Sequence, residues 1–171
     1  TSSYSVTGVQ TCALPISTWN EFDIEAGEWH LPKERTKTDA AIRIPLSPWV
    51  IEILKEQKKR SYNDYVFPVL RLAPGKVTKY MGETTLNHAL YMLQANLEPF
   101  TVHDLRRTAR THLAALGVPP HIAEMCLNHK PKGIEAVYNI HDYFSERKEA
   151  LQLLSDLLER CESQAEKESA S

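Results

Sequence analysis

The sequence contains one short string, His103-Asp104-Leu105-Arg106, in which a histidine and an arginine lie three positions apart. Residues at this spacing share one face of a helix, so two cationic hydrogen-bond donors would point the same way. Such a pair can bind a phosphate group or stabilise negative charge that develops during a reaction. Taken alone, the string fits the solvated basic face of an amphipathic helix equally well.

Two further side chains with chemical potential follow at longer spacing. His129 ends the string Leu-Asn-His, and Tyr138 comes nine residues later. A single histidine at a helix end is more often a cap or a surface residue, and a single tyrosine on an apolar helix is more often part of the core. Only the order and spacing of the whole set favour a functional site.

The elements that must position these residues form an α+β pattern, mainly α, in which a small antiparallel three-stranded sheet precedes a set of helices. Alternating segments predict strands at 21–25, 28–32 and 41–46, and the polar connection before the third strand carries Lys37 at its tip. A further short helix is expected around Tyr138. Helical spacing of apolar residues predicts the other helices at 48–60, 84–97, 103–116, 119–129 and 144–160. Ser47 and Gly117 are expected to cap the first and third of these.

Composition and charge describe one ordinary domain. The chain has 171 residues, 42% of them hydrophobic, and no stretch approaches the roughly 20 apolar residues that a membrane helix requires. It has 20 Lys plus Arg against 22 Asp plus Glu, a net charge of −2, which argues against a protein that coats nucleic acid without discrimination. Basic residues nevertheless gather at 33–43 and 103–110, so we expect a local positive face.

The three cysteines, Cys12, Cys126 and Cys161, are far apart and lack the spacing of a metal site. We therefore expect no disulfide framework, no metal and a reducing, cytoplasmic environment. The sequence contains no cofactor motif, so no cofactor is expected.

Taken together, these motifs resemble the tyrosine recombinase or phage integrase family, and the resemblance covers about 19–160. The family's site consists of an arginine, a lysine on a β-hairpin, a His-x-x-Arg motif, a second histidine or tryptophan, and a tyrosine nucleophile. The positions that match the residues after the first arginine are Lys37, His103, Arg106, His129 and Tyr138. The strings that look closest to integrases of phage satellites and genomic islands are Trp29-His30-Leu31-Pro32, Thr36-Lys37-Thr38, Ile44-Pro45-Leu46-Ser47 and Val66-Phe67-Pro68.

The resemblance implies site-specific recombination of double-stranded DNA attachment sites, with integration or excision of a mobile element through a 3′-phosphotyrosyl intermediate. Tyr138 would be the nucleophile, because a phenol of pKa about 10 becomes reactive in a cationic pocket or beside a base. Arg106 and His103 would stabilise the charged transition state, with His103 as the candidate base, and His129 would donate to the phosphate.

Lys37 would act as the general acid that protonates the leaving 5′ oxygen, with Lys33 and Arg35 as alternatives nearby. The reaction needs neither nucleotide nor metal, since the phosphotyrosyl bond retains the energy of the broken phosphodiester. We also expect an oligomer on DNA, close to the nucleoid. Weaker candidates for phosphate contacts are Arg35, Lys79, Asn87, Arg107 and Arg110.

The resemblance fails near the start of the chain. Gln10 stands where the family pattern has its first catalytic arginine, and a neutral amide cannot replace a bidentate guanidinium. Losing such a group costs on the order of 100-fold in rate. We expect 1–18 to be a foreign leader outside the fold, 19–160 to be a catalytic domain shortened at its amino end, without the family's upstream DNA-binding domain, and 161–171 to be a disordered tail. The fragment would then be impaired in cleavage.

Two other interpretations remain. The region 106–129, with Gly117 in the turn, could be a helix-turn-helix that binds DNA without cutting it. Replacing Tyr138 by phenylalanine separates the two, because only a recombinase would lose cleavage. Alternatively, the chain is a structural helical domain with chance polar spacing, which would show no affinity for DNA even at low salt.

Overall fold

The computed structural model describes residues 15–36, 40–69, 80–81, 83–93, 97–129 and 141–169. Four residues singled out in the sequence, Gln10, Lys37, Lys79 and Tyr138, lie outside these ranges, as does the short helix expected around Tyr138. The described strands are β1 (Phe22–Asp23), β2 (Glu28–Leu31) and β3 (Ile42–Pro45). The described helices are α2 (Pro48–Arg60), α3 (Glu83–Leu93), α4 (Val102–Ala115), α5 (Pro120–Cys126) and α7 (Phe144–Ser169), with short 3-10 turns η1 (Trp19–Glu21) and η2 (Lys33–Arg35).

The three strands form an antiparallel sheet in the order β1-β2-β3, as predicted. Alternation along β2 buries Trp29 and Leu31 and leaves Glu28 and His30 toward solvent. Trp29 pairs with Ile44 of β3 and stacks on the ring of Phe22 at a centroid distance of 5.2 Å. The sheet thus buries one face, against which α2 packs.

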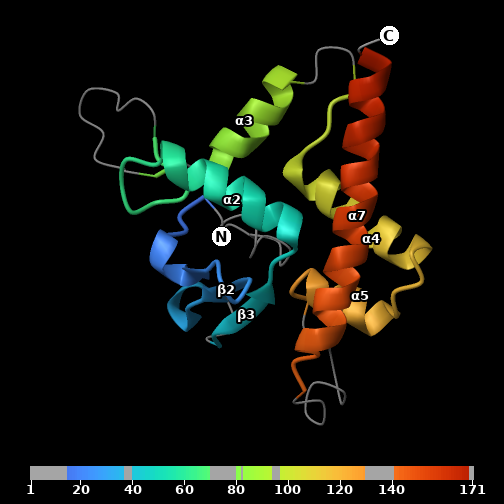
Figure 1. Cartoon of the computed structure of the whole chain (residues 1–171), viewed down its shortest axis with the longest axis horizontal. Helices are drawn as coiled ribbons and strands as arrows, with labels where there is room; N and C mark the ends of the chain where they lie inside the picture. Colours follow the sequence, from blue (N-terminus) through green and yellow to red (C-terminus); the bar gives the residue numbers. More distant parts are fainter. Residues whose placement is uncertain are drawn as a thin grey trace, which may run out of the picture.

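The molecule has two hydrophobic clusters, one in each half. Figure 1 shows α7 running along one side with α4 and α5 beside it, while the sheet and α2 occupy the other side. The cluster beneath the sheet, here called the sheet core, consists of Trp29, Leu31, Leu46, Leu54 and Val66. The cluster between α4, α5 and α7, here called the helix core, consists of Leu113, Val118, Ile122, Ala123, Cys126 and Ala150.

Helix ends follow the capping signals in the sequence. The hydroxyl of Ser47 accepts a hydrogen bond from the Val50 amide at 3.3 Å, which confirms the predicted start of α2. Gly117 has a φ of 81°, and it ends α4 with two hydrogen bonds, from Gly117 N to the Ala114 carbonyl and from Val118 N to the Leu113 carbonyl, each 3.0 Å. This is the left-handed closure that glycine allows at little cost, as predicted for this position.

The predicted amino boundary of the fold is wrong for residues 15–18, which belong to it. Pro15 and Ser17 are fully buried, and the Ser17 carbonyl accepts a hydrogen bond from Val66 N at 2.9 Å. Thr18 forms an isolated bridge with Tyr65. An extended segment held by single bridges carries no hydrophobic period, which is why the sequence pattern did not reveal it.

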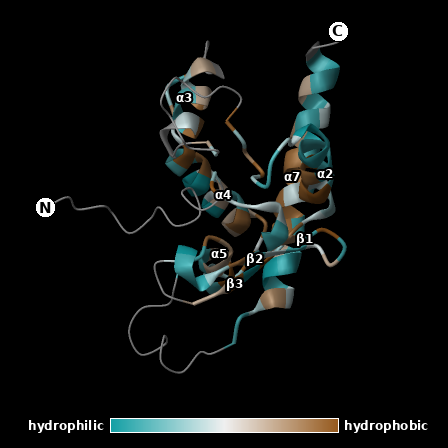
Figure 2. Cartoon of the chain, turned by 90° about the vertical axis from the view of Figure 1, so that its left-hand side faces the viewer, coloured by the Kyte–Doolittle hydropathy of each residue, from teal (hydrophilic) through white to brown (hydrophobic). Residues whose placement is uncertain are grey.

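The predicted carboxyl end is also corrected, because 161–169 continue α7 instead of forming a disordered tail. The side chains of 161–168 are exposed, and this end of the helix is hydrophilic (Figure 2). Glutamate, lysine and alanine favour helix even where nothing packs against them. No helix among the described ranges is both long enough and apolar enough to span a bilayer.

Apolar residues at helical spacing are not all buried in the structure. In α2, Ile53 is 51% exposed, whereas Ile51 packs against the sheet core. Of the helix expected over 84–97, the structure describes α3 as far as Leu93, residues 94–96 lie outside the described ranges, and the Leu97 side chain is 66% exposed. Both cases reflect tertiary packing that intrinsic spacing does not determine.

Candidate active site

The first turn of α4 holds the His-x-x-Arg motif in a fixed register. Thr101 and Asp104 form a capping box, in which the Asp104 carboxylate accepts from the Thr101 amide at 3.0 Å and from its hydroxyl at 2.8 Å. The side-chain oxygen of Asn87, on α3, accepts from Val102 N at 3.0 Å. Asn87, predicted as a weak phosphate contact, thus ties α3 to the start of α4.

His103, Arg106 and Arg110 follow one another at positions i, i+3 and i+7 and share one face of α4. His103 is exposed, whereas Arg106 and Arg110 are partly buried. Burial lowers the pKa of the Arg106 guanidinium, and the charge of Glu124 on α5 acts in the opposite direction. Arg106 therefore lies in the electrostatic field of a carboxylate that the sequence analysis did not single out.

Glu124 connects two elements of the site. Its Oε1 accepts from Arg110 Nε at 2.6 Å, and its Oε2 lies 2.5 Å from His129 Nδ1. Hydrogen bonds from Arg110 and then from His129 lower the pKa of Glu124, so the carboxylate is ionised at neutral pH. One acidic side chain thus holds a cation of α4 and the histidine that follows α5.

The chain after α5 turns sharply, and this turn places His129 beside Glu124. Asn128 has a φ of 55°, its N–H donates to the Met125 carbonyl at 2.9 Å, and the His129 N–H donates to the Glu124 carbonyl at 2.8 Å. This is a Schellman closure with asparagine as the left-handed residue. The sequence signal for it was available: a glutamate five positions before a histidine, with Asn immediately before that histidine.

The structure therefore brings Arg106, Arg110 and His129 together around Glu124, and it places His103 one turn before Arg106. Two other predicted residues are held elsewhere. Arg35 forms an ion pair with Glu21, and Arg107 is exposed, with Asp104 at 3.7 Å. Lys37 and Tyr138 lie outside the described residues, so their distances from this cluster are not defined.

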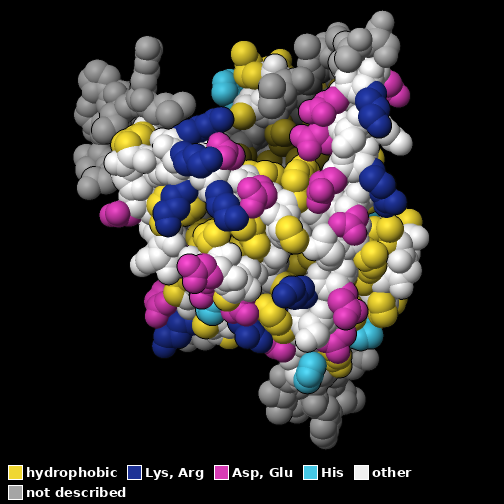
Figure 3. Space-filling model, in the orientation of Figure 1, with side chains coloured by type: hydrophobic (Ala, Val, Ile, Leu, Met, Phe, Trp, Pro, Cys, Tyr) yellow, Lys and Arg dark blue, Asp and Glu magenta, His cyan; other side chains and the backbone are white. Residues whose placement is uncertain are grey.

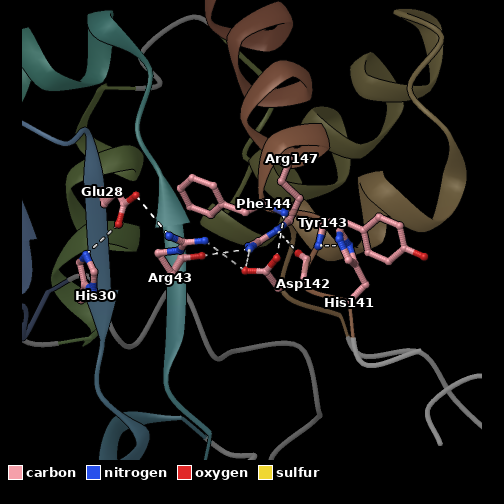
Figure 4. A network of polar contacts seen from close by, with 8 residues as sticks. All are labelled: Glu28, His30, Arg43, His141, Asp142, Tyr143, Phe144 and Arg147. Carbon is pink, nitrogen blue, oxygen red and sulfur yellow. Dashed lines mark hydrogen bonds and ion pairs between the residues drawn. The ribbon is translucent and has the colours of Figure 1, made fainter. Parts of the chain in front are cut away.

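A second polar network holds the start of α7 against the sheet, immediately after the segment that contains Tyr138 (Figure 4). Arg147 is buried, and its guanidinium donates to the Arg43 carbonyl at 3.1 Å and to the Asp142 carbonyl at 2.9 Å. Arg43 lies over the ring of Phe144 at 3.8 Å and reaches the Asp142 carboxylate at 3.5 Å. Burial lowers the pKa of Arg147, and Asp142 opposes that shift.

A basic surface that the sequence analysis missed lies on α2. In Figure 3, Lys and Arg side chains gather over this helix, whereas acidic side chains are spread along α7. Several of these basic side chains are exposed together on the helix, and some form ion pairs, as Lys55 does with Glu52 at 2.8 Å. The exposed basic residues are Lys55, Lys58, Lys59 and Arg60. Within the described ranges, no group of three or more His, Cys, Asp or Glu side chains could hold a metal ion.

Comparison with known proteins identifies a family and relatives within it. The model of the "Phage integrase family" matches residues 14–146. Prophage integrase IntA of Escherichia coli (strain K12) is 34% identical over 148 residues, and prophage integrase IntZ of the same organism is 30% identical over 157 residues. These alignments cover 85% and 90% of this chain but only 34% and 37% of the relatives, so the chain spans about a third of their length.

A solved structure has a similar fold. The integrase from mycobacterium phage Brujita superposes with a TM-score of 0.65, over 86% of this chain and 47% of that one. Sequence identity is 16%, so this similarity speaks for the fold alone. It agrees with the predicted arrangement of a small sheet and a helical core.

Proposed function

Since the chain belongs to the phage integrase family, we propose that it is a catalytic domain for site-specific DNA recombination. The observation that carries the proposal is the convergence of Arg106 and Arg110 from α4, and His129 from the end of α5, around the carboxylate of Glu124. Such a cluster can present cationic donors to a phosphodiester, whose charge increases in the transition state.

In the proposed reaction, the Tyr138 hydroxyl attacks the scissile phosphorus. The bond from phosphorus to the 5′ oxygen breaks, and a 3′-phosphotyrosyl bond forms. His103 accepts the phenol proton, Lys37 protonates the departing 5′ oxygen, and Arg106 and His129 donate to the non-bridging oxygens. Attack by a 5′ hydroxyl of another strand reverses these steps and rejoins the DNA.

The substrates would be duplex attachment sites in the cytoplasm, occupied by an oligomer of the protein. We propose that Gln10 limits the reaction, because a neutral amide replaces an arginine that the family pattern places there. Gln10→Arg should then cleave on the order of 100-fold faster.

The test uses nicked duplexes that carry the junction sequences flanking the encoding gene, which trap a covalent intermediate. We expect the chain, and more strongly Gln10→Arg, to form a protein–DNA adduct that survives denaturing electrophoresis. Tyr138→Phe should form no adduct but should still shift the same DNA at low salt.

Three results would contradict the proposal in different ways. An adduct that persists in Tyr138→Phe would exclude this nucleophile. DNA binding without an adduct in every variant would favour the helix-turn-helix interpretation. No DNA affinity even at low salt would favour a purely structural domain.

A further inference from the structure

We propose that Glu124 is a positioning residue: it fixes the imidazole of His129 so that Nδ1–H is directed at the carboxylate and Nε2 is the atom that meets a phosphate oxygen. The inference rests on the proposed function, because it assigns the phosphate of the DNA backbone as the ligand of His129. It concerns a residue that belongs to none of the motifs identified in the sequence.

The first step is the backbone geometry. The left-handed closure at Asn128 makes the His129 N–H donate to the Glu124 carbonyl at 2.8 Å. The two residues are therefore bound at the main chain as well as through their side chains. Their relative position is set by the end of α5 and does not depend on a flexible surface contact.

The second step is the direction of the side-chain hydrogen bond. An ionised carboxylate can only accept, so the 2.5 Å contact between Glu124 Oε2 and His129 Nδ1 requires a proton on Nδ1. The other oxygen accepts from Arg110 Nε at 2.6 Å, which fixes the plane of the carboxylate. Glu124 thus selects one tautomer of the neutral imidazole.

The third step concerns the opposite side of the ring. Among the described residues, His129 Nε2 is buried and has no hydrogen-bond partner. A buried polar atom without a partner destabilises the fold, so such an atom calls for an explanation, and a bound ligand supplies one. A phosphate oxygen also only accepts, so a phosphate at Nε2 binds the doubly protonated ring, whose other proton stays on Nδ1 and is directed at Glu124.

An ordinary structural salt bridge is the competing explanation. The Glu124 side chain is 43% exposed and that of His129 is 37% exposed, and pairs this exposed contribute little to stability. A purely structural role predicts a small effect on unfolding and no change in the affinity of His129 for phosphate. The positioning role predicts that loss of the Nδ1–H tautomer is accompanied by weaker phosphate binding.

The experiment compares the whole ¹⁵N-labelled chain with Glu124→Ala, Glu124→Gln and the control Glu149→Gln, which alters an exposed residue of α7. Nuclear magnetic resonance of the imidazole nitrogens reports which nitrogen of neutral His129 carries the proton. We expect Nδ1–H in the unaltered chain and in Glu149→Gln, and the Nε2–H form that free histidine prefers in Glu124→Ala. Glu124→Gln should keep Nδ1–H, because its amide oxygen still accepts.

Titration with inorganic phosphate gives the second measurement, followed at His129 Nε2. By analogy with second-layer partners of metal-binding histidines, Glu124→Ala should weaken phosphate binding about 10-fold or more. Glu124→Gln should weaken it less, since it loses the charge but keeps the orientation. The control should bind phosphate as the unaltered chain does.

An Nδ1–H tautomer that persists in Glu124→Ala, or unchanged phosphate affinity in that variant, would overturn the inference. Neither measurement requires DNA cleavage. If the tautomer and affinity change as expected while no variant, including Gln10→Arg, forms a DNA adduct, the positioning role stands and the recombinase proposal fails.

Discussion

The two halves of the molecule are held together by different physical means. The sheet core is built on large side chains, with Trp29 stacked on Phe22 and Leu31 and Val66 fully buried. The helix core contains smaller residues such as Ala123 and Ala150, and its helices are also joined by charged side chains. Small residues let helix backbones approach closely but bury less apolar area per residue.

This difference suggests why the cluster of catalytic candidates lies in the helical half. A site for a charged phosphate needs cations that are held in place yet accessible. The carboxylate of Glu124 on α5 holds the guanidinium of Arg110 on α4 in place, whereas Arg147 connects the helical half to β3.

Substitutions in the two cores should have the largest effects on stability and should show whether the two halves differ. Leu31→Ala and Leu113→Ala each remove a side chain that is 0% exposed, and each should lower the free energy of unfolding by about 2–5 kcal/mol, measured by urea denaturation. Only Leu113→Ala should also shift the imidazole resonances of His129 under native conditions. Equal shifts of the His129 resonances in both variants would show that the sheet core also determines the position of His129. Leu153→Ala, at a 44% exposed position, is the matched control and should cost much less.

The connection between the halves should be the next most sensitive point. Arg147→Met keeps an apolar stem but removes donors to two carbonyl groups, so we expect a loss of about 1–3 kcal/mol and faster amide exchange in the first turn of α7. Arg43→Met, at a side chain 45% exposed, should cost about 0–1 kcal/mol. If both variants cost the same, the burial of Arg147 would be unimportant.

The polar cluster should have a smaller effect on stability that depends on pH. Hydrogen bonds from Arg110 and His129 hold the folded-state pKa of Glu124 below its ordinary value of 4.5. Its contribution is therefore present above pH 4.5 and is lost as the pH falls through the folded-state pKa. The stability difference between the unaltered chain and Glu124→Gln should be under about 1 kcal/mol at neutral pH and should shrink toward acid. A difference that grew on acidification would contradict this assignment.

The smallest expected effect concerns the thiol of Cys126 in the helix core, which we expect to be unreactive in the folded protein. Burial raises the pKa of the Cys126 thiol to about 11, so it stays protonated at neutral pH. In a Cys12→Ser background, iodoacetamide should modify the exposed Cys161 in the native protein and Cys126 only after unfolding, as read by mass spectrometry. Modification of Cys126 at a similar native rate would indicate that the helix core opens easily.

Much of the fold was predictable because its signals are local. Ser47 and Gly117 mark helix ends through their own conformational preferences, and the alternation along β2 identifies its buried face. The family, the mainly helical fold and the three-stranded sheet are confirmed. The roles of Tyr138 and Lys37 stay predictions, because both residues lie outside the described ranges.

The rest depended on contacts that spacing does not encode. Ser17 is buried, and its carbonyl accepts a hydrogen bond from the N–H of Val66, far away in the chain. Glu124 meets His129 because Asn128 adopts a left-handed conformation that turns the chain back toward the end of α5. Arg35 was predicted as a weak phosphate contact, but its guanidinium forms an ion pair with Glu21.

The left-handed backbone conformation at Asn128 also restricts which residues can replace it. Glycine at this position would keep the turn without strain, whereas a β-branched residue such as valine or isoleucine would oppose it. The constraint comes from the main chain, although Asn128 has no chemical role in the proposed site. In a saturation library at position 128, we therefore expect folded variants to carry residues that tolerate a positive φ. The range of residues found there would show how much the position of His129 depends on this turn.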